Sequence, residues 1–169
     1  MIGGGEGNFV RRFLGPENQQ HFHQALTRYL DYYSRHLGDQ TRLYPGVQEI
    51  LAHFSGKKLA VLSNKLHRLT EKVLQVLGLR PFWVAVRGGG MDLALKPSPE
   101  ALTALMGELG VEPSRTLMVG DKPADVLAGQ GAGAHTAAVT YGYGDPASLA
   151  ALAPDFLVSH IAELKNLLV

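Results

Sequence analysis

Polar side chains that could bind a phosphate group and a divalent cation occur at three places along the chain. They are Ser63, Asn64 and Lys65 after the apolar run 59–62, Lys96 within LKPSPE, and Asp121 and Asp125 after the apolar run 116–119. A hydroxyl and an amide donate hydrogen bonds to phosphate oxygens, a lysine neutralises charge, and hard carboxylate oxygens bind Mg²⁺. The set therefore favours a site for phosphate and magnesium.

Each of these residues also has a structural explanation when it is considered alone. Ser63 and Asn64 could cap the helix that follows them. Lys96 could be a solvated surface lysine, and the two aspartates could interact with the dipole of a helix N-terminus. The order and the placement of all of them together favour the functional interpretation.

Short apolar runs alternate with amphipathic segments, and this alternation predicts the elements that position the polar set. The predicted strands are Leu59–Leu62, Phe82–Val86, Thr116–Val119, His135–Thr140 and Phe156–Val158. The predicted helices lie near Gly46–Phe54, Leu66–Leu77, Pro99–Leu109, Ala124–Gln130 and Ala147–Leu152. Gly78 and Gly110 follow two of these helices, where a left-handed cap residue belongs. The pattern predicts an α/β fold with a parallel sheet that is covered on both faces and binds ligands at the carboxyl ends of its strands.

The first part of the chain has a different pattern. Apolar and aromatic residues recur at three- and four-residue spacings over Pro16–His36, which predicts a helix with one apolar face. The turn-rich segment GDQTRLYPG follows it. We therefore expect a boundary there, with residues 1–43 and 44–169 forming two units.

The composition excludes several classes of function. Lysine plus arginine (16) nearly balances aspartate plus glutamate (15), so no long-range field attracts nucleic acid or an anionic membrane. The chain has no cysteine, which excludes disulfides and thiol catalysis. No apolar run approaches the ~20 residues that span a bilayer, and the opening lacks the apolar core of a signal peptide. We expect a cytoplasmic protein.

Three segments, LAVLSNK, LKPSPEAL and LMVGDKPADVLAGQGAGAHTAAVTYGYG, resemble the second, third and fourth motifs of haloacid dehalogenase-type phosphatases, in the same order. VTYGYG, PDFLVSHIAELKNLL and the opening GGGEGNFVRRFLG are similar to the phosphoglycolate phosphatase branch in particular. The resemblance implies a three-layer Rossmann-like core over residues 44–169. It also implies that residues 1–43 are the remainder of a helical cap.

The resemblance further implies a role for the residues that would contact phosphate. Ser63, Asn64 and Lys65 would bind the phosphoryl group that is transferred. Lys96 would stabilise both this group and the nucleophile that attacks it. The implied substrate is a small phosphorylated metabolite, and 2-phosphoglycolate is the best match.

The same resemblance implies a magnesium site. Asp121 would ligate Mg²⁺, and Asp125, as a catalytic residue, would support the metal shell. Arg11 and Arg12 could meet a substrate carboxylate from the cap, or they could be solvated helix charges.

One motif of the family has no counterpart in the chain. The motif is Asp-x-Asp-Gly-Thr at the end of the first strand, where the first aspartate attacks phosphorus and the second is the general acid and base. The chain contains seven aspartates, none before Asp31, and no two of them are separated by a single residue. We expect the first strand to be missing, the sheet to form two halves with unpaired inner edges, and turnover to fall by on the order of 10⁴–10⁶.

Three functions stay open at this point. The leading one is a magnesium-dependent phosphatase. The second is a non-catalytic phosphate-binding remnant, or a half-enzyme that needs a partner to donate a strand. The third is a dehalogenase, which is disfavoured because Ser-Asn, Lys96 and the Gly-Asp…Asp pattern suit phosphate better than carbon–halogen chemistry.

Overall fold

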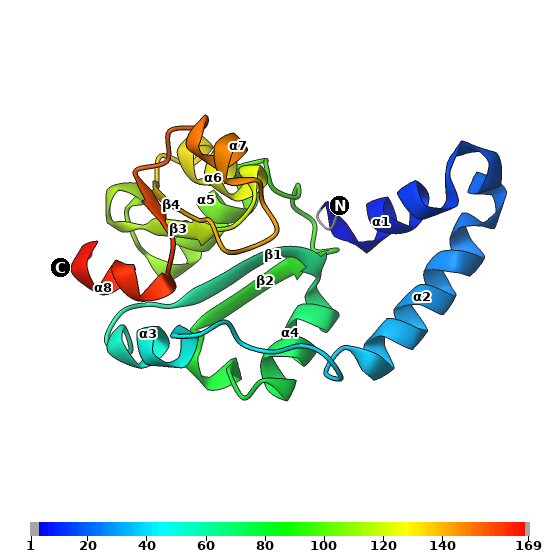
Figure 1. Ribbon diagram of the computed structural model, residues 1–169, viewed down its shortest axis with the longest axis horizontal. Coiled ribbons are helices and arrows are strands. Elements are labelled where there is room, and N and C mark those ends of the chain that lie inside the picture. Colours follow the sequence, from blue (N-terminus) through cyan, green and yellow to red (C-terminus); the bar gives the residue numbers. More distant parts are fainter. Residues whose placement is uncertain (1–3, 168–169) are drawn as a thin grey trace.

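The computed structural model describes residues 4–167, and their strands form two separate parallel sheets (Figure 1). The first sheet pairs β1 (Ala60–Leu66) with β2 (Ala85–Gly89). The second has the order β3 (Leu117–Gly120), β4 (His135–Val139) and β5 (Phe156–Val158), so β4 is central. Within the described residues no ladder joins β1 to β3, as the expected division into two half-sheets requires.

Helices cover both faces of the sheets. The α-helices are α3 (Val47–His53), α4 (His67–Val76), α5 (Glu100–Leu109), α6 (Pro123–Gly131), α7 (Pro146–Ala150) and α8 (Leu164–Leu167), with 3-10 helices η2 (Arg80–Phe82), η3 (Pro113–Arg115) and η4 (Ile161–Glu163) between them. One apolar cluster packs α3, α4 and α8 against the strands, whereas two others contain α5, α6 and α7. The predicted three-layer α/β architecture is confirmed.

Alternating side chains show that the two half-sheets share one core. Successive residues of a strand point to opposite faces of its sheet. Ala137 and Val139 of β4 accordingly lie in the cluster of α3, α4 and α8, and Ala138 lies in the opposite one. Val61 of β1 joins the first cluster, and its neighbour Leu62 packs against the cluster of α5. Both half-sheets therefore belong to the same three-layer body.

A helical hairpin precedes this body and projects away from the sheets (Figure 1). It consists of α1 (Gly5–Leu14), η1 (Pro16–His21) and α2 (Phe22–His36). The helical segment predicted over Pro16–His36 is confirmed, but it has two parts, because it starts as a 3-10 helix that bends at Asn18 (φ −118°) before α2 begins. No periodicity predicted helix α1, although the resemblance implied a helical cap over this segment. The boundary near residue 43 and the identity of the hairpin as a cap stay predictions.

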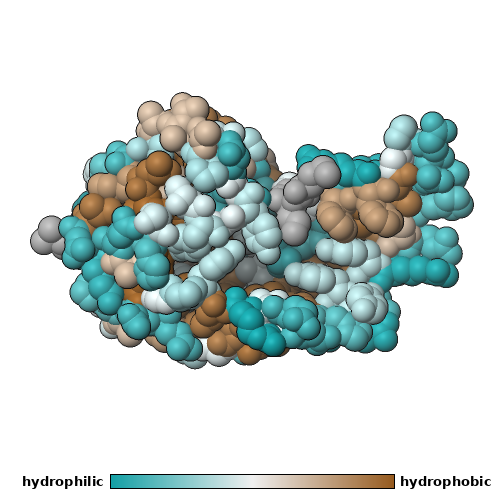
Figure 2. Space-filling model, in the orientation of Figure 1, coloured by the Kyte–Doolittle hydropathy of each residue, from teal (hydrophilic) through white to brown (hydrophobic). Residues whose placement is uncertain are grey.

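The hairpin is held together by aromatic rings. The Phe9 ring of α1 lies 5.2 Å from the Tyr29 ring of α2, and Tyr29 stacks on Tyr33 at 5.6 Å. Burial, then Tyr33 and then Glu6, raise the pKa of Tyr29 above its ordinary value. The end of the hairpin farthest from the sheets is mainly hydrophilic, whereas hydrophobic patches lie on the rest of the hairpin and over the body (Figure 2).

The remaining predicted elements agree with the structure except at the first two strands. The strand predicted at Leu59–Leu62 extends to Leu66. The strand predicted at Phe82–Val86 begins only at Ala85, because Phe82 closes η2, whose first turn contains Pro81. Gly78 and Gly110 have positive φ angles of 68° and 59°, as predicted for cap residues. No helix in the described part of the chain is long and apolar enough to cross a membrane.

Candidate active site

Residues 63–65 form a bulge near the end of β1. The register with β2 shifts between Leu62 and Leu66, so these three residues lie beside the single residue Gly88. Strand β1 thus continues past Leu62, where it was predicted to end. A side chain at Gly88 would bring its Cβ within 2.4 Å of the Cα of His67, so only glycine allows this close approach. Bulges redirect side chains, and they often lie beside active sites.

Ser63 and Asn64 do not cap the following helix. The N-cap of α4 is Leu66, and no side chain caps it. Ser63 Oγ instead accepts a hydrogen bond from the backbone N–H of Lys65 (3.2 Å). Asn64 exchanges two hydrogen bonds with the backbone of Lys96: Nδ2 donates to the carbonyl (2.8 Å), and Oδ1 accepts from the N–H (2.9 Å). Asn64 therefore fixes the Lys96 segment beside the bulge.

Lys96 bridges the two half-sheets. Its Nζ donates to the carbonyl of Leu62 on β1 (2.6 Å) and lies 2.8 Å from Oδ1 of Asp125, at the start of α6. The side chains of Lys96 and Asp125 are 8% and 10% exposed. Lys96 is thus a buried, paired lysine, and its interpretation as a solvated surface residue is excluded.

Asp125 also stabilises the first turn of α6. Its Oδ2 accepts a hydrogen bond from the backbone N–H of Lys122 (2.9 Å), so both of its oxygens have partners. The dipole of the helix N-terminus favours a carboxylate at this position. Gly120 is packed against the same side chain, because a Cβ there would lie 2.3 Å from it. Asp125 therefore does interact with the N-terminus of a helix, and the same carboxylate also pairs with Lys96.

Asp121 directly follows β3 and is enclosed by the loop after β4. Its Oδ2 accepts a hydrogen bond from the backbone N–H of Tyr143 (2.7 Å). A Cβ at Gly142 would lie 2.3 Å from the Asp121 side chain, and one at Gly144 would lie only 1.9 Å from the Asp121 carbonyl oxygen.

Tyr141 lies in the same loop as Gly142. Burial, then Tyr44 and then Asp121, raise the pKa of Tyr141 above its ordinary value, so its phenol stays protonated at neutral pH.

The carboxylates suit Mg²⁺ better than a metal that needs a full protein cage. In the described residues no three His, Cys, Asp or Glu side chains are grouped as a metal site. Mg²⁺ is commonly held by one or two carboxylates, with water and substrate phosphate completing its shell. Asp121 uses one oxygen for Tyr143, whereas Asp125 uses both oxygens elsewhere. The donor chemistry thus fits Mg²⁺ with Asp121 as the protein ligand.

Lys65 turns toward the hairpin. Its Nζ donates to the hydroxyl of Tyr33 on α2 (2.8 Å) and lies 3.7 Å from the carboxylate of Glu6 on α1. Sequence reasoning singled out neither Tyr33 nor Glu6 for the site. No local pattern could have done so, because the partners are about 30 and 60 residues apart in the chain.

Arg11 and Arg12 are exposed on α1. The guanidinium of Arg11 lies 3.8 Å from the centre of the Phe22 ring, and it donates to Gln19. These contacts are made within the hairpin, so they favour a structural role for Arg11 over a contact with a substrate carboxylate.

A small cleft lies beside the bulge. Ser63, Asn64, Lys96 and Arg87 are among the residues that line it. Arg87 was not predicted as a site residue, and its guanidinium pairs with Glu108 on α5. Of the predicted polar residues, Ser63, Asn64 and Lys96 therefore share one cleft on the side of β1, and Lys96 connects that cleft to Asp125. Lys65 and Asp121 do not line it.

A family model described as haloacid dehalogenase-like hydrolase matches residues 2–133. The chain belongs to this family. The matched range includes the bulge with Ser63 and Asn64, Lys96 at the bridge and the two aspartates after β3. The resemblance noted from the sequence is thereby confirmed at the level of the haloacid dehalogenase-like hydrolases.

The relatives of this family member include phosphoglycolate phosphatases. The enzyme of that name from Vibrio vulnificus is 37% identical over 143 residues, which are 83% of this chain and 63% of the relative. The one from Haemophilus influenzae is 35% identical over 147 residues, 86% of this chain and 66% of the relative. The chain thus spans about two thirds of their length.

A solved structure is similar over nearly the whole chain. The crystal structure of a predicted phosphoglycolate phosphatase from Haemophilus somnus has a TM-score of 0.84 and 26% identity, and the match covers 98% of this chain and 78% of that one. The two sheets, their covering helices and the hairpin therefore correspond to a fold that exists in a longer hydrolase-like chain.

Proposed function

We propose that this chain carries the phosphate- and magnesium-binding part of a phosphatase for small phosphate monoesters, with 2-phosphoglycolate as the first candidate substrate. The observation that carries the proposal is the Lys96 bridge, in which a buried ammonium joins the bulge of β1 to Asp125. A cation at such a position suits a phosphoryl group, whose charge it would offset. The names of the related enzymes support the choice of substrate.

Each residue of the set has a role in this proposal. Ser63 and the second Nδ2 hydrogen of Asn64 would donate to phosphoryl oxygens. Lys96 would offset their charge, with Asp125 holding its ammonium in place. Asp121 would hold Mg²⁺, which when bound supplies further charge neutralisation at the phosphate. Lys65 would contact the ligand from the side of the hairpin.

The attacking carboxylate would come from outside these 169 residues. A carboxylate oxygen would bond to phosphorus while the bond to the leaving oxygen breaks, and a second aspartate would protonate that oxygen. Water would then attack the phosphorus of the aspartyl-phosphate while the second aspartate, now a carboxylate, takes a proton from it. The bond between phosphorus and the first aspartate would break, which releases inorganic phosphate and restores that carboxylate. The unpaired edges of β1 and β3 suit a strand that would carry such a pair, because the bridge lies where the two edges end.

The test compares the chain with a fused version of it. An apolar strand ending in Asp-x-Asp-Gly-Thr is joined to the N-terminus through a Gly/Ser linker. The fused chain should be more stable and should release phosphate from 2-phosphoglycolate with Mg²⁺, while the unfused chain should not. The matched controls replace the first aspartate of the strand by asparagine, or carry Asp121→Asn.

Two outcomes would overturn the proposal. One is a fused chain that gains stability from the strand yet hydrolyses none of a panel of small phosphate esters. The other is an unfused chain that does not bind orthovanadate with Mg²⁺, or whose binding survives both Lys96→Met and Asp121→Asn. Rapid hydrolysis by the unfused chain would instead refute the need for an added carboxylate.

A second candidate is a non-catalytic phosphate-binding protein. It is favoured by the aspartates themselves, since no two of them are separated by a single residue as the attacking pair requires. This candidate predicts that the unfused chain binds orthovanadate and that the fused strand produces no phosphate release.

A further inference from the structure

Glu6 is a buried carboxylate that the proposed function does not use. It lies in the first turn of α1, and its side chain is only 5% exposed. Burying a charged carboxylate is costly unless it is paired and hydrogen-bonded. A favourable interaction with the helix dipole does not require burial, since an exposed carboxylate in the first turn has it too. The burial therefore indicates a specific contact.

The contacts of Glu6 join the hairpin to the bulge. Its Oε2 accepts a hydrogen bond from the backbone N–H of Leu66, the last residue of β1 (3.0 Å). Its Oε1 lies 3.7 Å from Nζ of Lys65, which donates to Tyr33 on α2 at 2.8 Å. One carboxylate thus connects α1 to the strand directly and to α2 through a lysine.

A neighbouring glycine fixes the same interface. Gly5 has a φ angle of +83°, and a Cβ there would lie 3.3 Å from the carbonyl oxygen of Asn64. Asn64 is the residue whose side chain holds Lys96. The start of α1 therefore touches both Asn64 and Leu66, and so it sets the position of the hairpin over the bulge.

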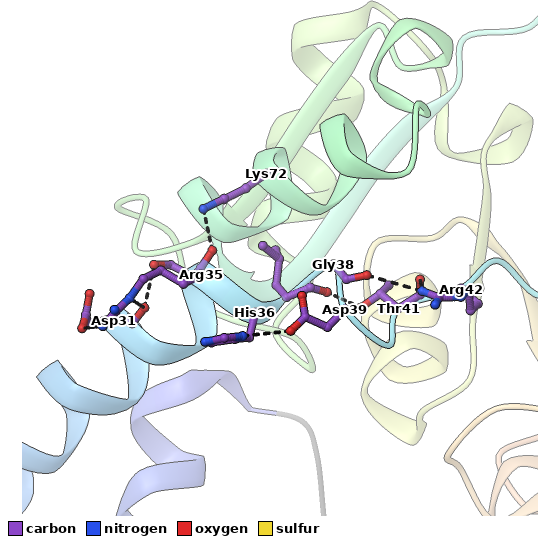
Figure 3. A network of polar contacts seen from close by, with 10 residues as sticks. Asp31, Arg35, His36, Gly38, Asp39, Thr41, Arg42 and Lys72 are labelled. Atoms are coloured by element: carbon purple, nitrogen blue, oxygen red, sulfur yellow. Dashed lines mark hydrogen bonds and ion pairs between the residues drawn. The ribbon is translucent and has the colours of Figure 1, made fainter.

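The other end of the hairpin is attached in a different way. Near the end of α2, Lys72 of α4 donates to the carbonyl of Ser34, while Asp31 pairs with Arg35 and His36 with Asp39 (Figure 3). These polar contacts are exposed, and exposed ion pairs contribute little to stability. Although Leu37 at this end is buried, the polar contacts are not, so the buried polar anchor of the hairpin is at Glu6.

We propose that Glu6 is a positioning residue that fixes the hairpin over residues 63–65 and holds the Lys65 ammonium on the hairpin side of the site. The charge of Glu6 orients Lys65, and its hydrogen bond to Leu66 holds the end of the bulge. Tyr33 completes the arrangement from α2. This assignment is independent of whether the chain proves to be a phosphatase.

The test uses the full chain and separates the two contacts. Glu6→Gln keeps an acceptor for the Leu66 N–H but removes the charge, whereas Glu6→Ala removes both. Mass spectrometry after brief acetylation gives the labelling rate of Lys65 relative to Lys58, an exposed lysine elsewhere in the chain. NMR gives the hydrogen-exchange rate of the Leu66 amide.

The expected results differ between the variants. Lys65 labelling should rise by about fivefold in Glu6→Gln and further in Glu6→Ala, because the ammonium loses its carboxylate partner and keeps only the hydroxyl of Tyr33. Exchange at Leu66 should speed up by about tenfold only in Glu6→Ala, because only this variant lacks the acceptor. Glu17→Gln, an exposed carboxylate of the same hairpin, should change neither rate.

Two results would overturn the assignment. One is unchanged Lys65 labelling in both Glu6 variants. The other is a Glu6→Ala variant in which every lysine and amide gains the same factor, since that would be a general loss of stability. If the fused chain described above hydrolyses a phosphate ester, Glu6→Gln should raise KM more than it lowers kcat. The labelling test does not depend on this activity, so it still applies if the phosphatase proposal fails.

Discussion

The two half-sheets differ in how completely their strands are enclosed. In the sheet of β3 to β5, the central β4 has a neighbour on each side, and Ala138 is 0% exposed. In the other sheet, every residue of β1 stays partly exposed. Val119 on β3, which pairs with β4 on one side only, is 36% exposed. The candidate site thus lies where two incompletely enclosed strands end, and the completely enclosed strand contributes only the loop that surrounds Asp121.

The halves also hold their polar residues by different means. On the side of β1 they are held by the shape of the bulged backbone, which its glycine contacts allow, and by the neutral side-chain amide of Asn64. On the side of β3 the carboxylates do it, because Asp125 and Asp121 accept from backbone N–H groups. The Lys96 ammonium contacts both halves, through the carbonyl of Leu62 and the carboxylate of Asp125. The following predictions test how strongly each half depends on its own contacts and on this bridge.

The largest effect is expected for Asp125→Ala. The variant leaves the buried Lys96 charge without its partner, which typically costs about 3–5 kcal/mol in the free energy of unfolding. Urea denaturation measures the loss. Asp121→Asn, which keeps an acceptor for Tyr143 and does not touch the bridge, should cost less than about 1 kcal/mol. The double variant Asp125→Ala/Lys96→Met should recover part of the loss, and a double variant no more stable than the single one would contradict the pairing.

Asn64→Ala should have the next largest effect. It leaves the N–H and carbonyl of Lys96 without their side-chain partners, at a cost of about 1–3 kcal/mol in the free energy of unfolding. Ser63→Ala is the matched control in the same bulge, and it should cost less because it removes one 3.2 Å contact. Equal losses in the two variants would show that the amide does not fix the Lys96 segment.

A pH-dependent effect is expected at Asp155, beside β4. Hydrogen bonds from the backbone and then the hydroxyl of Thr136, and then from His135, lower the pKa of Asp155. A lowered folded pKa adds stability above the ordinary aspartate pKa of about 4, and this is lost as pH falls through the folded value. Asp155→Asn should therefore be less stable than the wild type at pH 7, by on the order of 1 kcal/mol after solvent screening. The difference should vanish in strong acid, and urea denaturation at both pH values checks this.

Arg35→Ala should have the smallest effect. Its ion pair with Asp31 is exposed, with both side chains more than 60% accessible (64% and 62%). Such i,i+4 pairs are worth about 0.3–0.5 kcal/mol. A thermal melt should show a shift of about 2 °C or less. A larger shift would mean that the exposed end of α2 anchors the hairpin after all.

The sequence predicted the parallel α/β architecture and the two half-sheets, because apolar runs, helix caps and motif order are local signals. It missed α1, whose opening glycines disfavour helix on propensity alone, although Gly4 provides the left-handed start. It ended β1 at Leu62, since Ser63 and Asn64 are not typical strand residues and the bulge depends on Gly88 of another strand. It could not predict Glu6, because a contact with Leu66 is set by tertiary packing.

The glycines around the two aspartates have a consequence for genetic experiments. Gly142 and Gly144 leave no room for a Cβ beside Asp121, and Gly120 leaves none beside Asp125. A saturation screen would therefore score these glycines as intolerant as the acidic residues themselves, although they carry no reactive group. Substitutions at these glycines fail because the acidic side chains occupy the space. A map of intolerant positions would therefore include more residues than those that take part in the chemistry.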